Sequence, residues 1–275
     1  MTGRRISLAG LTQAQRTTAI TVAAVLALIA TVVGATLVSG SGNRDLASDT
    51  PGKGGGTHSP SAGTHTPSRP ATVPVPDSIQ HQPEAAGKAV NITIDDGPDP
   101  VWTPQVLSVL KQYGVHATFC MIGPQAAAHP DLVRRVVAEG HRLCDHTVHH
   151  NESMDHKPLA YQKSEILDAL DMIEDASGGA HVQYYRAPGG AFTPASRALA
   201  AQHGMRPLGW NVDTKDFSRP GVNAIMHTLK YEISNGPTIL FHDGGGDRSQ
   251  TVEALRQALP WLRQQGYAFS FPKVK

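Results

Sequence analysis

The sequence predicts an α/β domain built on a parallel sheet, either open and doubly wound or closed as a barrel. Two observations predict this class. Short apolar runs alternate with amphipathic stretches along the C-terminal part of the chain, which gives about seven strand-helix units. Titratable residues follow the strand-like runs, as expected where parallel strands end at a common functional edge.

The elements can be placed from the periodicity of the apolar residues. We expect strands at 89–94, 116–123, 141–144, 182–186, 205–212, 237–241 and 267–272. Between them we expect amphipathic helices at 103–114, 130–140, 159–176, 194–204, 222–236 and 252–262. Polar residues end or follow five of these strands, and we therefore expect them to meet at one edge of the sheet.

A membrane segment is predicted ahead of this domain. Residues 19–38 contain no charge over twenty positions and are long enough to cross the hydrocarbon layer as a helix. Arg4, Arg5 and Arg16 precede it, so the positive-inside bias places residues 1–18 in the cytoplasm and the remainder of the chain outside. We expect a single-pass anchor in the cell membrane, with secretion after cleavage near residue 40 as the alternative.

The segment between the anchor and the domain has the composition of a linker. Residues 39–86 are rich in Gly, Ser, Thr and Pro and cannot bury a core, so we expect them to be disordered. Residues 87–275 are one domain's worth of chain, which we expect to be monomeric. The net charge is +1 and no long Lys/Arg run occurs, so no nucleic-acid partner is expected.

The two cysteines leave a choice open. Cys120 and Cys144 each lie in a short apolar run, where a buried free thiol packs well. Outside the membrane the same two residues could equally form a disulfide.

A pair of carboxylates ends the first predicted strand. Neighbouring side chains of a strand point to opposite faces, so Asp95 and Asp96 can converge on one site only if the strand stops there. Gly97 and Pro98 provide that break. A plain turn rich in Asp, Gly and Pro is the alternative interpretation.

Two histidines after the third strand have the spacing of metal ligands. His146 and His150 are four residues apart, which would place both rings on one face of a helical turn, and His149 would then be a bystander. A solvated polar turn is the alternative. One carboxylate with two imidazoles and open positions suits a catalytic Zn²⁺ or a similar divalent ion. Asp145 could orient a ligand imidazole or merely begin the turn.

Five ordered motifs of this chain resemble those of the polysaccharide deacetylases, carbohydrate esterase family 4. The motifs are TIDDGP at 93–98, HTVHH at 146–150, RAPGG at 186–190, DTKDF at 213–217 and ILFH at 239–242. The resemblance extends over essentially the whole domain, from about Val90 to Phe271. It implies a distorted (β/α) barrel of about seven or eight units.

The resemblance also implies a role for each matching residue. The implied catalytic residues are Asp95 as general base, Arg186 to position it, and His242 as general acid supported by Asp216. The implied ligands of one divalent metal ion are Asp96, His146 and His150, with Zn²⁺ expected first and Co²⁺ or Ni²⁺ as alternatives. The remaining implied residues are Gly189, whose backbone N–H would hold the oxyanion, and Trp210 and Phe217 on the substrate side.

The predicted function is that of a metal-dependent hydrolase. It would remove acetyl groups from an extracellular or cell-wall polysaccharide, with the N-acetyl groups of peptidoglycan or chitooligosaccharides first and O-acetyl xylan second. Ile94, Gly189 and Phe217 stand where the family commonly has Phe, an aromatic residue and Trp, and these departures bear on the choice of substrate. A non-catalytic glycan-binding domain and a two-His-one-carboxylate iron oxygenase are the alternatives from other classes. The glycine-rich residues 244–246 are expected to form a flexible loop at the rim.

Overall fold

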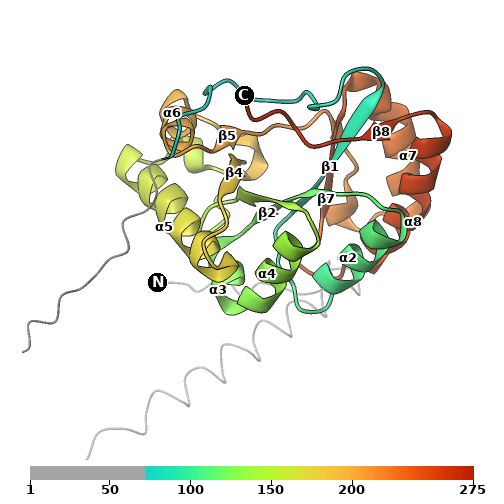
Figure 1. Ribbon diagram of the computed structural model, residues 1–275, viewed down its shortest axis with the longest axis horizontal. Coiled ribbons are helices and arrows are strands. Elements are labelled where there is room, and N and C mark those ends of the chain that lie inside the picture. Colours follow the sequence, from blue (N-terminus) through green and yellow to red (C-terminus); the bar gives the residue numbers. More distant parts are fainter. Residues whose placement is uncertain (1–71) are drawn as a thin grey trace, which may run out of the picture. The chain divides into compact units, whose positions relative to one another are not determined.

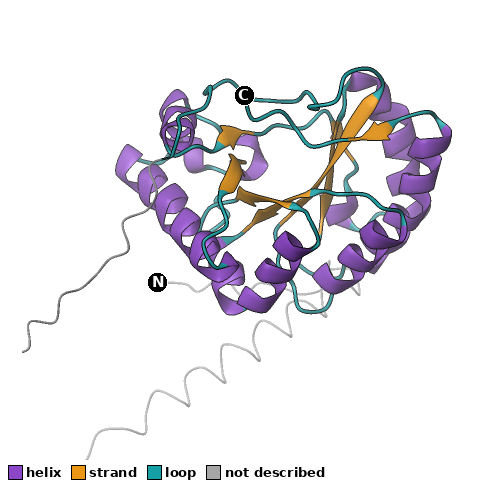
Figure 2. Cartoon of the chain, viewed as in Figure 1, coloured by secondary structure: helices purple, strands orange, loops and turns teal. Residues whose placement is uncertain are grey.

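A curled sheet of parallel strands lies at the centre of the domain, and helices cover its outer side (Figure 1, Figure 2). The computed structural model describes residues 72–275. Within these residues no helix is long and apolar enough to cross a membrane. The predicted cytoplasmic segment at 1–18, the predicted membrane segment at 19–38 and the first part of the predicted linker lie outside the described residues.

Strands and helices alternate along the chain. The strands are β1 (Ala89–Asp95), β2 (Thr118–Met121), β3 (Arg142–Asp145), β4 (Val182–Tyr185), β5 (Arg206–Pro207), β6 (Val212–Asp213), β7 (Thr238–His242) and β8 (Ala268–Phe269). The helices are α2 (Thr103–Gln112), α3 (Gly123–Ala128), α4 (Pro130–Ala138), α5 (Leu159–Ser177), α6 (Pro194–Gln202), α7 (Val222–Glu232) and α8 (Ser249–Gln264). Short 3₁₀ turns lie at Met154–His156, Pro188–Gly190, Asp216–Ser218 and Ile233–Asn235.

The strand order is that of a barrel left open at one place. Hydrogen-bonded neighbours follow the order β5-β4-β3-β2-β1-β7-β6, with β8 paired to β1, and every pair is parallel. Strands consecutive in the chain are therefore neighbours around the curl, with two exceptions: β5 and β6 stand at its two ends, and β8 pairs with β1 instead of with β7. The predicted α/β class and distorted (β/α) barrel are confirmed.

Burial explains the composition of the central strands. All seven residues of β1 are buried, because β2 and β7 flank the strand and helices pack outside it. A strand covered on both faces has no reason to alternate polar and apolar side chains, which accounts for the apolar run AVNITI. The helices in turn bury one stripe each, such as Leu132, Val133 and Val136 in α4.

The prediction of a single strand at 205–212 is wrong. This stretch contains β5 and β6, separated by residues 208–211 that cross the open place of the barrel. The carbonyl oxygens of Leu208 and Gly209 accept hydrogen bonds from the side chain of Arg186, so they do not take part in a strand ladder. A Cβ at Gly209 would overlap the ring of His81, which also requires a glycine at this crossing.

Residues 75–84, which we call the N-terminal strap, hydrogen-bond to the domain although they fall inside the predicted linker. The backbone N–H of Val75 donates to Ala201 at 3.0 Å, and that of Glu84 donates to Phe271 at 2.8 Å. Gln80 forms a bridge with Leu208 beyond the end of β5. The folded part therefore begins N-terminal to Gly87.

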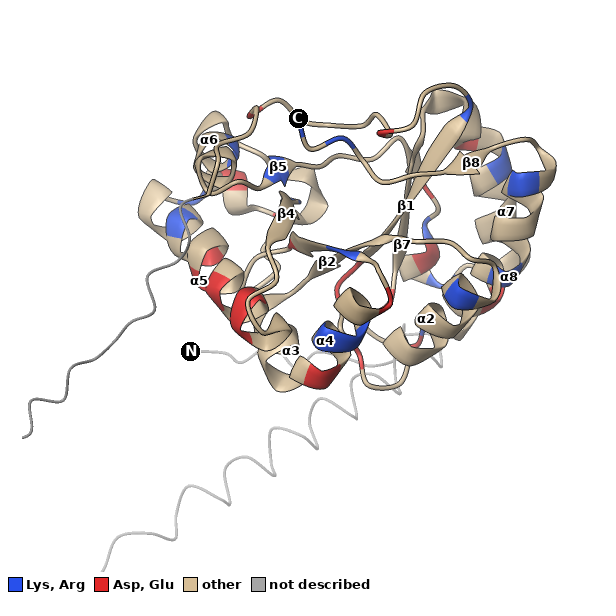
Figure 3. Cartoon of the chain, viewed as in Figure 1, with Lys and Arg blue, Asp and Glu red and all other residues tan. Residues whose placement is uncertain are grey.

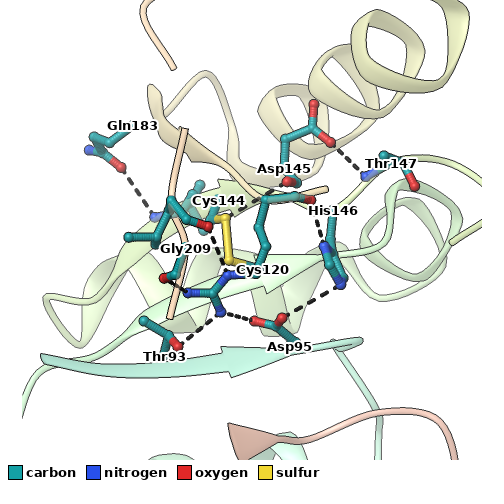
Figure 4. Close-up of a disulfide and its surroundings, with 12 residues drawn as sticks. Thr93, Asp95, Cys120, Cys144, Asp145, His146, Thr147, Gln183 and Gly209 are labelled. Atoms are coloured by element: carbon teal, nitrogen blue, oxygen red, sulfur yellow. Dashed lines mark hydrogen bonds and ion pairs between the residues drawn. A yellow bond between two sulfur atoms is a disulfide. The ribbon is translucent and has the colours of Figure 1, made fainter. Parts of the chain in front are cut away.

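Cys120 and Cys144 form a disulfide (Figure 4). They are register partners on the adjacent strands β2 and β3, and both are fully buried next to Tyr184 and Leu208. Of the two alternatives that the sequence left open, the structure contains the disulfide.

Candidate active site

The carboxyl ends of the central strands bring the polar residues to one edge of the sheet. Asp95 ends β1 and His242 ends β7, and the two are register partners on neighbouring strands. Asp145 ends β3, and His146 follows it directly. A cleft of about 520 Å³ opens at this edge. Its lining comprises Asp95, Asp96, His146, His150, Glu152, Gly189, Trp210, Asp213, Lys215, Phe217, Leu240, His242, Gly245 and Arg248. Eight of the ten predicted site residues thus line one cleft, and the other two, Arg186 and Asp216, are fully buried.

Asp96, His146 and His150 form a group that could hold a metal ion, with one donor atom from each residue within 4.8 Å of the others. Oδ1 of Asp96 lies 3.2 Å from Nε2 of His150 and 3.6 Å from Nε2 of His146. That oxygen is buried and has no hydrogen-bond partner, so neither nitrogen meets it in hydrogen-bond geometry. A buried carboxylate oxygen without a donor is costly, and a cation bound between the three atoms would satisfy it. The donor set therefore fits a divalent ion.

The ring of His146 is held in the orientation that a metal ligand needs. Its Nδ1 lies 2.7 Å from the carbonyl oxygen of Arg186, which can only accept, so Nδ1 carries the proton and Nε2 presents its lone pair to the group. Burial lowers the pKa of His146 to about 3, against the opposing charge of Asp96. The ring is accordingly neutral at physiological pH, as ligation requires.

The two histidines do not converge through a helical turn, and that prediction is wrong. Residues 146–150 form an irregular loop in which Thr147 and His150 have positive φ angles of 71° and 50°. Asp145, whose role the sequence left open, accepts the backbone N–H of Thr147 at 2.7 Å and so begins the turn (Figure 4). The ring of His149 is largely exposed, as expected of a residue outside the ligand group.

A buried ion pair stands beside the group of ligands. Nη1 of Arg186 donates to Oδ1 of Asp95 at 2.7 Å, and both side chains are almost completely buried. The guanidinium also donates to Thr93, Leu208 and Gly209, and its partners Thr93, Asp95 and Gly209 are labelled in Figure 4. Burial raises the pKa of Asp95, and the charge of Arg186 opposes this rise. A carboxylate with a raised pKa is better suited to accept a proton near neutrality.

His242 and Asp216 form a second buried pair. Nδ1 of His242 donates to Oδ1 of Asp216 at 2.7 Å, and Oδ2 of Asp216 accepts the backbone N–H of His242 and the hydroxyl of Thr251. Burial alone would lower the pKa of His242, but the hydrogen bond and charge of Asp216 outweigh it and raise the pKa to about 9. His242 is therefore an imidazolium at neutral pH, able to give a proton.

The rim of the cleft carries few aromatic side chains. Phe217 is 45% exposed and meets the ring of His242 edge-on, with 5.4 Å between centroids. Gly189 has a φ of 59°, a left-handed conformation that side chains rarely adopt. A Cβ at the next residue, Gly190, would contact the ring of Trp210 at 3.2 Å. Trp210 and Phe217 thus remain as the aromatic surfaces that line the cleft.

One residue that supports the site was placed at a strand end by the sequence but was assigned no role from it. Asp243, directly after His242, is fully buried, accepts a hydrogen bond from the hydroxyl of Thr103 at 2.6 Å, and has a pKa that burial raises to about 7. A Cβ at Gly97 would overlap its carboxylate, which explains the glycine there. The one available signal was the position of Asp243 at the end of an apolar strand.

The glycine-rich residues 244–246 are held in place more closely than the expected flexible loop. A Cβ at Gly244 would overlap the carbonyl oxygen of Asp96, so the two loops are in direct contact. Arg248, only 3% exposed, donates to the carbonyl oxygens of Gly244 and Gly245 and to that of Phe217. Arg248 therefore ties this segment to the backbone at Phe217, another residue that lines the cleft.

A candidate metal-binding triad, a buried carboxylate beside it and an imidazolium held by a second carboxylate, all at the carboxyl edge of a parallel α/β barrel, define a site of the hydrolase class. The family model described as polysaccharide deacetylase matches residues 82–208. The chain belongs to the polysaccharide deacetylase family, carbohydrate esterase family 4, as its motifs indicated.

The chain is similar to curated deacetylases and to solved structures of the same family. It is 40% identical over 187 residues to a peptidoglycan-N-acetylglucosamine deacetylase of Bacillus cereus, covering 66% of this chain and 85% of that protein. It is 39% identical over 191 residues to a chitooligosaccharide deacetylase of a Bradyrhizobium species, covering 66% and 87%. A solved structure described as a pseudoenzyme of the same family, from Bacillus anthracis, matches with a TM-score of 0.63 and 25% identity, covering 70% of this chain and 65% of that one.

Proposed function

We propose that this protein is a metal-dependent hydrolase that removes N-acetyl groups from an amino-sugar polysaccharide outside the cell membrane. The observation that carries the proposal is the position of Asp95 and His242. They end neighbouring strands in register, and both line the cleft that holds Asp96, His146 and His150. Hydrolysis of an amide needs a general base and a general acid beside the metal site, and these two residues on neighbouring strands can supply them.

The residues divide the chemistry between them. A divalent ion held by Asp96, His146 and His150 would lower the pKa of a water molecule and polarise the acetyl carbonyl. Asp95, kept in place by Arg186, accepts the proton of the attacking water. The backbone N–H of Gly189, a residue that lines the cleft, would bind the developing oxyanion. His242, protonated through its bond to Asp216, gives a proton to the leaving nitrogen of the sugar.

The substrate that we propose is a polymer containing N-acetylglucosamine, either peptidoglycan or a chitooligosaccharide. Support comes from the names of the two relatives, which act on these two glycans. The cleft offers Trp210 and Phe217 for stacking on a sugar ring. Zn²⁺ is the proposed ion, because two imidazoles and one carboxylate are a common zinc ligand set, with Co²⁺ or Ni²⁺ as substitutes.

The location that we propose follows from the sequence. An anchor at 19–38 would hold the domain on the outer side of the cell membrane, where cell-wall polymers are within reach of a tethered domain. The disulfide between Cys120 and Cys144 supports an oxidising compartment. Labelling with a membrane-impermeant amine reagent on intact cells would test this location, and protection of the lysines of the domain until lysis would contradict it.

Acetate release by the full chain is the test of the activity. After treatment with EDTA the protein should release no acetate from peptidoglycan, chitooligosaccharides or acetylated xylan, and Zn²⁺, Co²⁺ or Ni²⁺ should restore release from the N-acetylated glycans. Release from xylan alone would replace the N-acetyl substrate by the O-acetyl one. No release from any of them at full metal occupancy would favour a non-catalytic glycan-binding role, as the likeness to a pseudoenzyme allows.

A further inference from the structure

The loop between His146 and His150 adopts a conformation that its own residues do not favour. Thr147 and His150 both have positive φ, and each non-glycine residue in that region costs about 1–2 kcal/mol. None of residues 146–150 belongs to a helix or strand. Contacts from outside the loop are therefore needed to hold the second histidine against Asp96.

Side-chain oxygens bind four successive backbone N–H groups of this loop. Asp145 accepts from Thr147 at 2.7 Å, and the hydroxyl of Thr147 accepts from His150 at 3.2 Å. The two N–H groups between them, those of Val148 and His149, both donate to Oε2 of Glu165, at 3.2 and 2.9 Å. Two of these acceptors are local to the loop, whereas Glu165 comes from α5, which starts at Leu159.

Glu165 is placed to act as a fixed support. Its side chain is only 2% exposed, and its second oxygen, Oε1, lies 2.5 Å from Nδ1 of the His149 ring. One buried carboxylate thus binds three groups of one loop. Because the ring of His149 is 71% exposed, we expect the two backbone contacts to carry most of the effect.

The two metal-binding histidines differ in how much they need this support. His146 continues β3, its N–H donates to the carbonyl of Met121, and its ring is fixed by the carbonyl of Arg186. His150 has a single bond from its N–H, to Thr147, and its side chain is 29% exposed. Loosening of the loop would therefore displace His150 and leave His146 in place.

We propose that Glu165 is a positioning residue of the metal site, which holds His150 in place by binding the two backbone N–H groups that precede it. This inference rests on the metal dependence of the proposed function. Residues that support metal ligands in this way typically contribute about 10–100-fold to metal affinity. The effect of Glu165 should fall on the affinity for the ion, and it should pass through His150.

The first experiment measures Zn²⁺ affinity of the full chain by competition with a chromophoric chelator. Glu165→Leu should bind Zn²⁺ about 10–100-fold more weakly than the wild type. Glu165→Gln, which keeps one acceptor oxygen, should lose less, and His149→Ala should stay within about threefold because both backbone bonds remain. Acidic residues are spaced along α5 (Figure 3), so Asp168→Asn, an exposed residue of the same helix, is the control for loss of charge.

The second experiment separates positioning of His150 from a general effect. In a His150→Ala background, Glu165→Leu should cause no further loss of Zn²⁺ affinity, whereas in a His146→Ala background it should still weaken binding. An equal loss in both backgrounds, or wild-type affinity in Glu165→Leu, would overturn the inference. Urea unfolding of the metal-free variants shows whether each is folded, and if the leucine variant is not, the same comparison is made with Glu165→Gln.

The outcomes also separate this inference from the proposed function. A wild-type protein that binds Zn²⁺ at this site but releases no acetate would sink the deacetylase proposal and leave the role of Glu165 intact. A wild-type protein that binds no Zn²⁺, Co²⁺ or Ni²⁺ would overturn the role of Glu165. Acetate release without any bound metal would likewise overturn it, while the deacetylase activity itself would stand.

Discussion

The carbonyl oxygen of Arg186 accepts a hydrogen bond from Nδ1 of His146 at 2.7 Å, while the side chain of the same arginine binds Asp95. One residue therefore fixes the ring of a proposed metal ligand with its backbone and the proposed base with its guanidinium. The two contacts respond differently to mutation, because only the second depends on the side chain.

Replacement of Arg186 by Met should impair catalysis while leaving metal affinity nearly unchanged. Without the cation, burial raises the pKa of Asp95 further, so the acidic limb of the kcat/KM profile should move to higher pH. We expect kcat/KM to fall on the order of 100-fold. Arg142→Met, which removes an arginine paired with Glu84 away from the cleft, is the control. A large loss of Zn²⁺ affinity in Arg186→Met would contradict the division between backbone and side chain.

Replacement of Asp216 by Asn should move the basic limb of the profile to lower pH. The pKa of His242 is about 9, so the wild-type residue keeps its proton up to roughly that pH. In the variant, burial still disfavours the imidazolium and the stabilising charge is gone, so the proton is lost at lower pH. The measurement is kcat/KM between about pH 6 and 10. Asp131→Asn, an exposed residue of α4, should leave the limb unchanged, and an unchanged limb in Asp216→Asn would argue against His242 as the acid.

Replacement of Gly244 by Ala should weaken metal binding from outside the ligand set. The new Cβ would overlap the carbonyl oxygen of Asp96 and push that loop away from the two imidazoles. We expect Zn²⁺ affinity to fall about tenfold or more. Gly246→Ala is the control for a disturbance of the same segment without the contact, since its Cβ would meet open space although its φ of 130° strains the backbone. Equal losses in both variants would mean that a general disturbance of the segment, and not the contact with Asp96, is responsible.

Removal of the disulfide should reduce stability without removing activity. The sulfur atoms close a loop of 24 residues and do not line the cleft, so the double variant Cys120→Ala/Cys144→Ala should lose about 2–4 kcal/mol of unfolding free energy. Urea unfolding measures the change, and reduction of the wild type should reproduce it. A loss of kcat in the folded variant would show that the pairing of β2 with β3 also shapes the site.

The residues of the candidate site could be predicted from the sequence because strand ends and motif order are both encoded locally. Asp95, Asp96 and His242 directly end or follow apolar runs, and parallel strands must end at one edge. The spacing of His146 and His150 predicts that they form a pair, but it does not predict the loop conformation that brings their rings together. The loop conformation depends on Glu165, whose contact with residues 148 and 149 is tertiary.

Most of the other features that the sequence did not predict depend on backbone contacts. Nothing in the letters of RAPGG shows that the carbonyl oxygen of Arg186 binds His146. The pattern of residues 205–212 predicts one strand, because it does not show the break between β5 and β6. At that break the carbonyl oxygens of Leu208 and Gly209 accept hydrogen bonds from the side chain of Arg186, which follows β4. The choice between thiols and a disulfide was likewise settled only by the register of β2 and β3.

The N-terminal strap has a mechanical consequence. The peptide of Gln80 bonds to Pro207 and Gly209, on both sides of Leu208, and Leu208 and Gly209 supply the two carbonyl oxygens that hold the guanidinium of Arg186. A force that pulls on the chain ahead of Val75 would therefore reach the hydrogen bonds between Gln80 and residues 207–209, which support Arg186 and through it the proposed base, before it reached β1. For the same reason, a protein shortened to begin at Gly87 would lack Gln80, and the two carbonyl groups that bind Arg186 would lose part of their support.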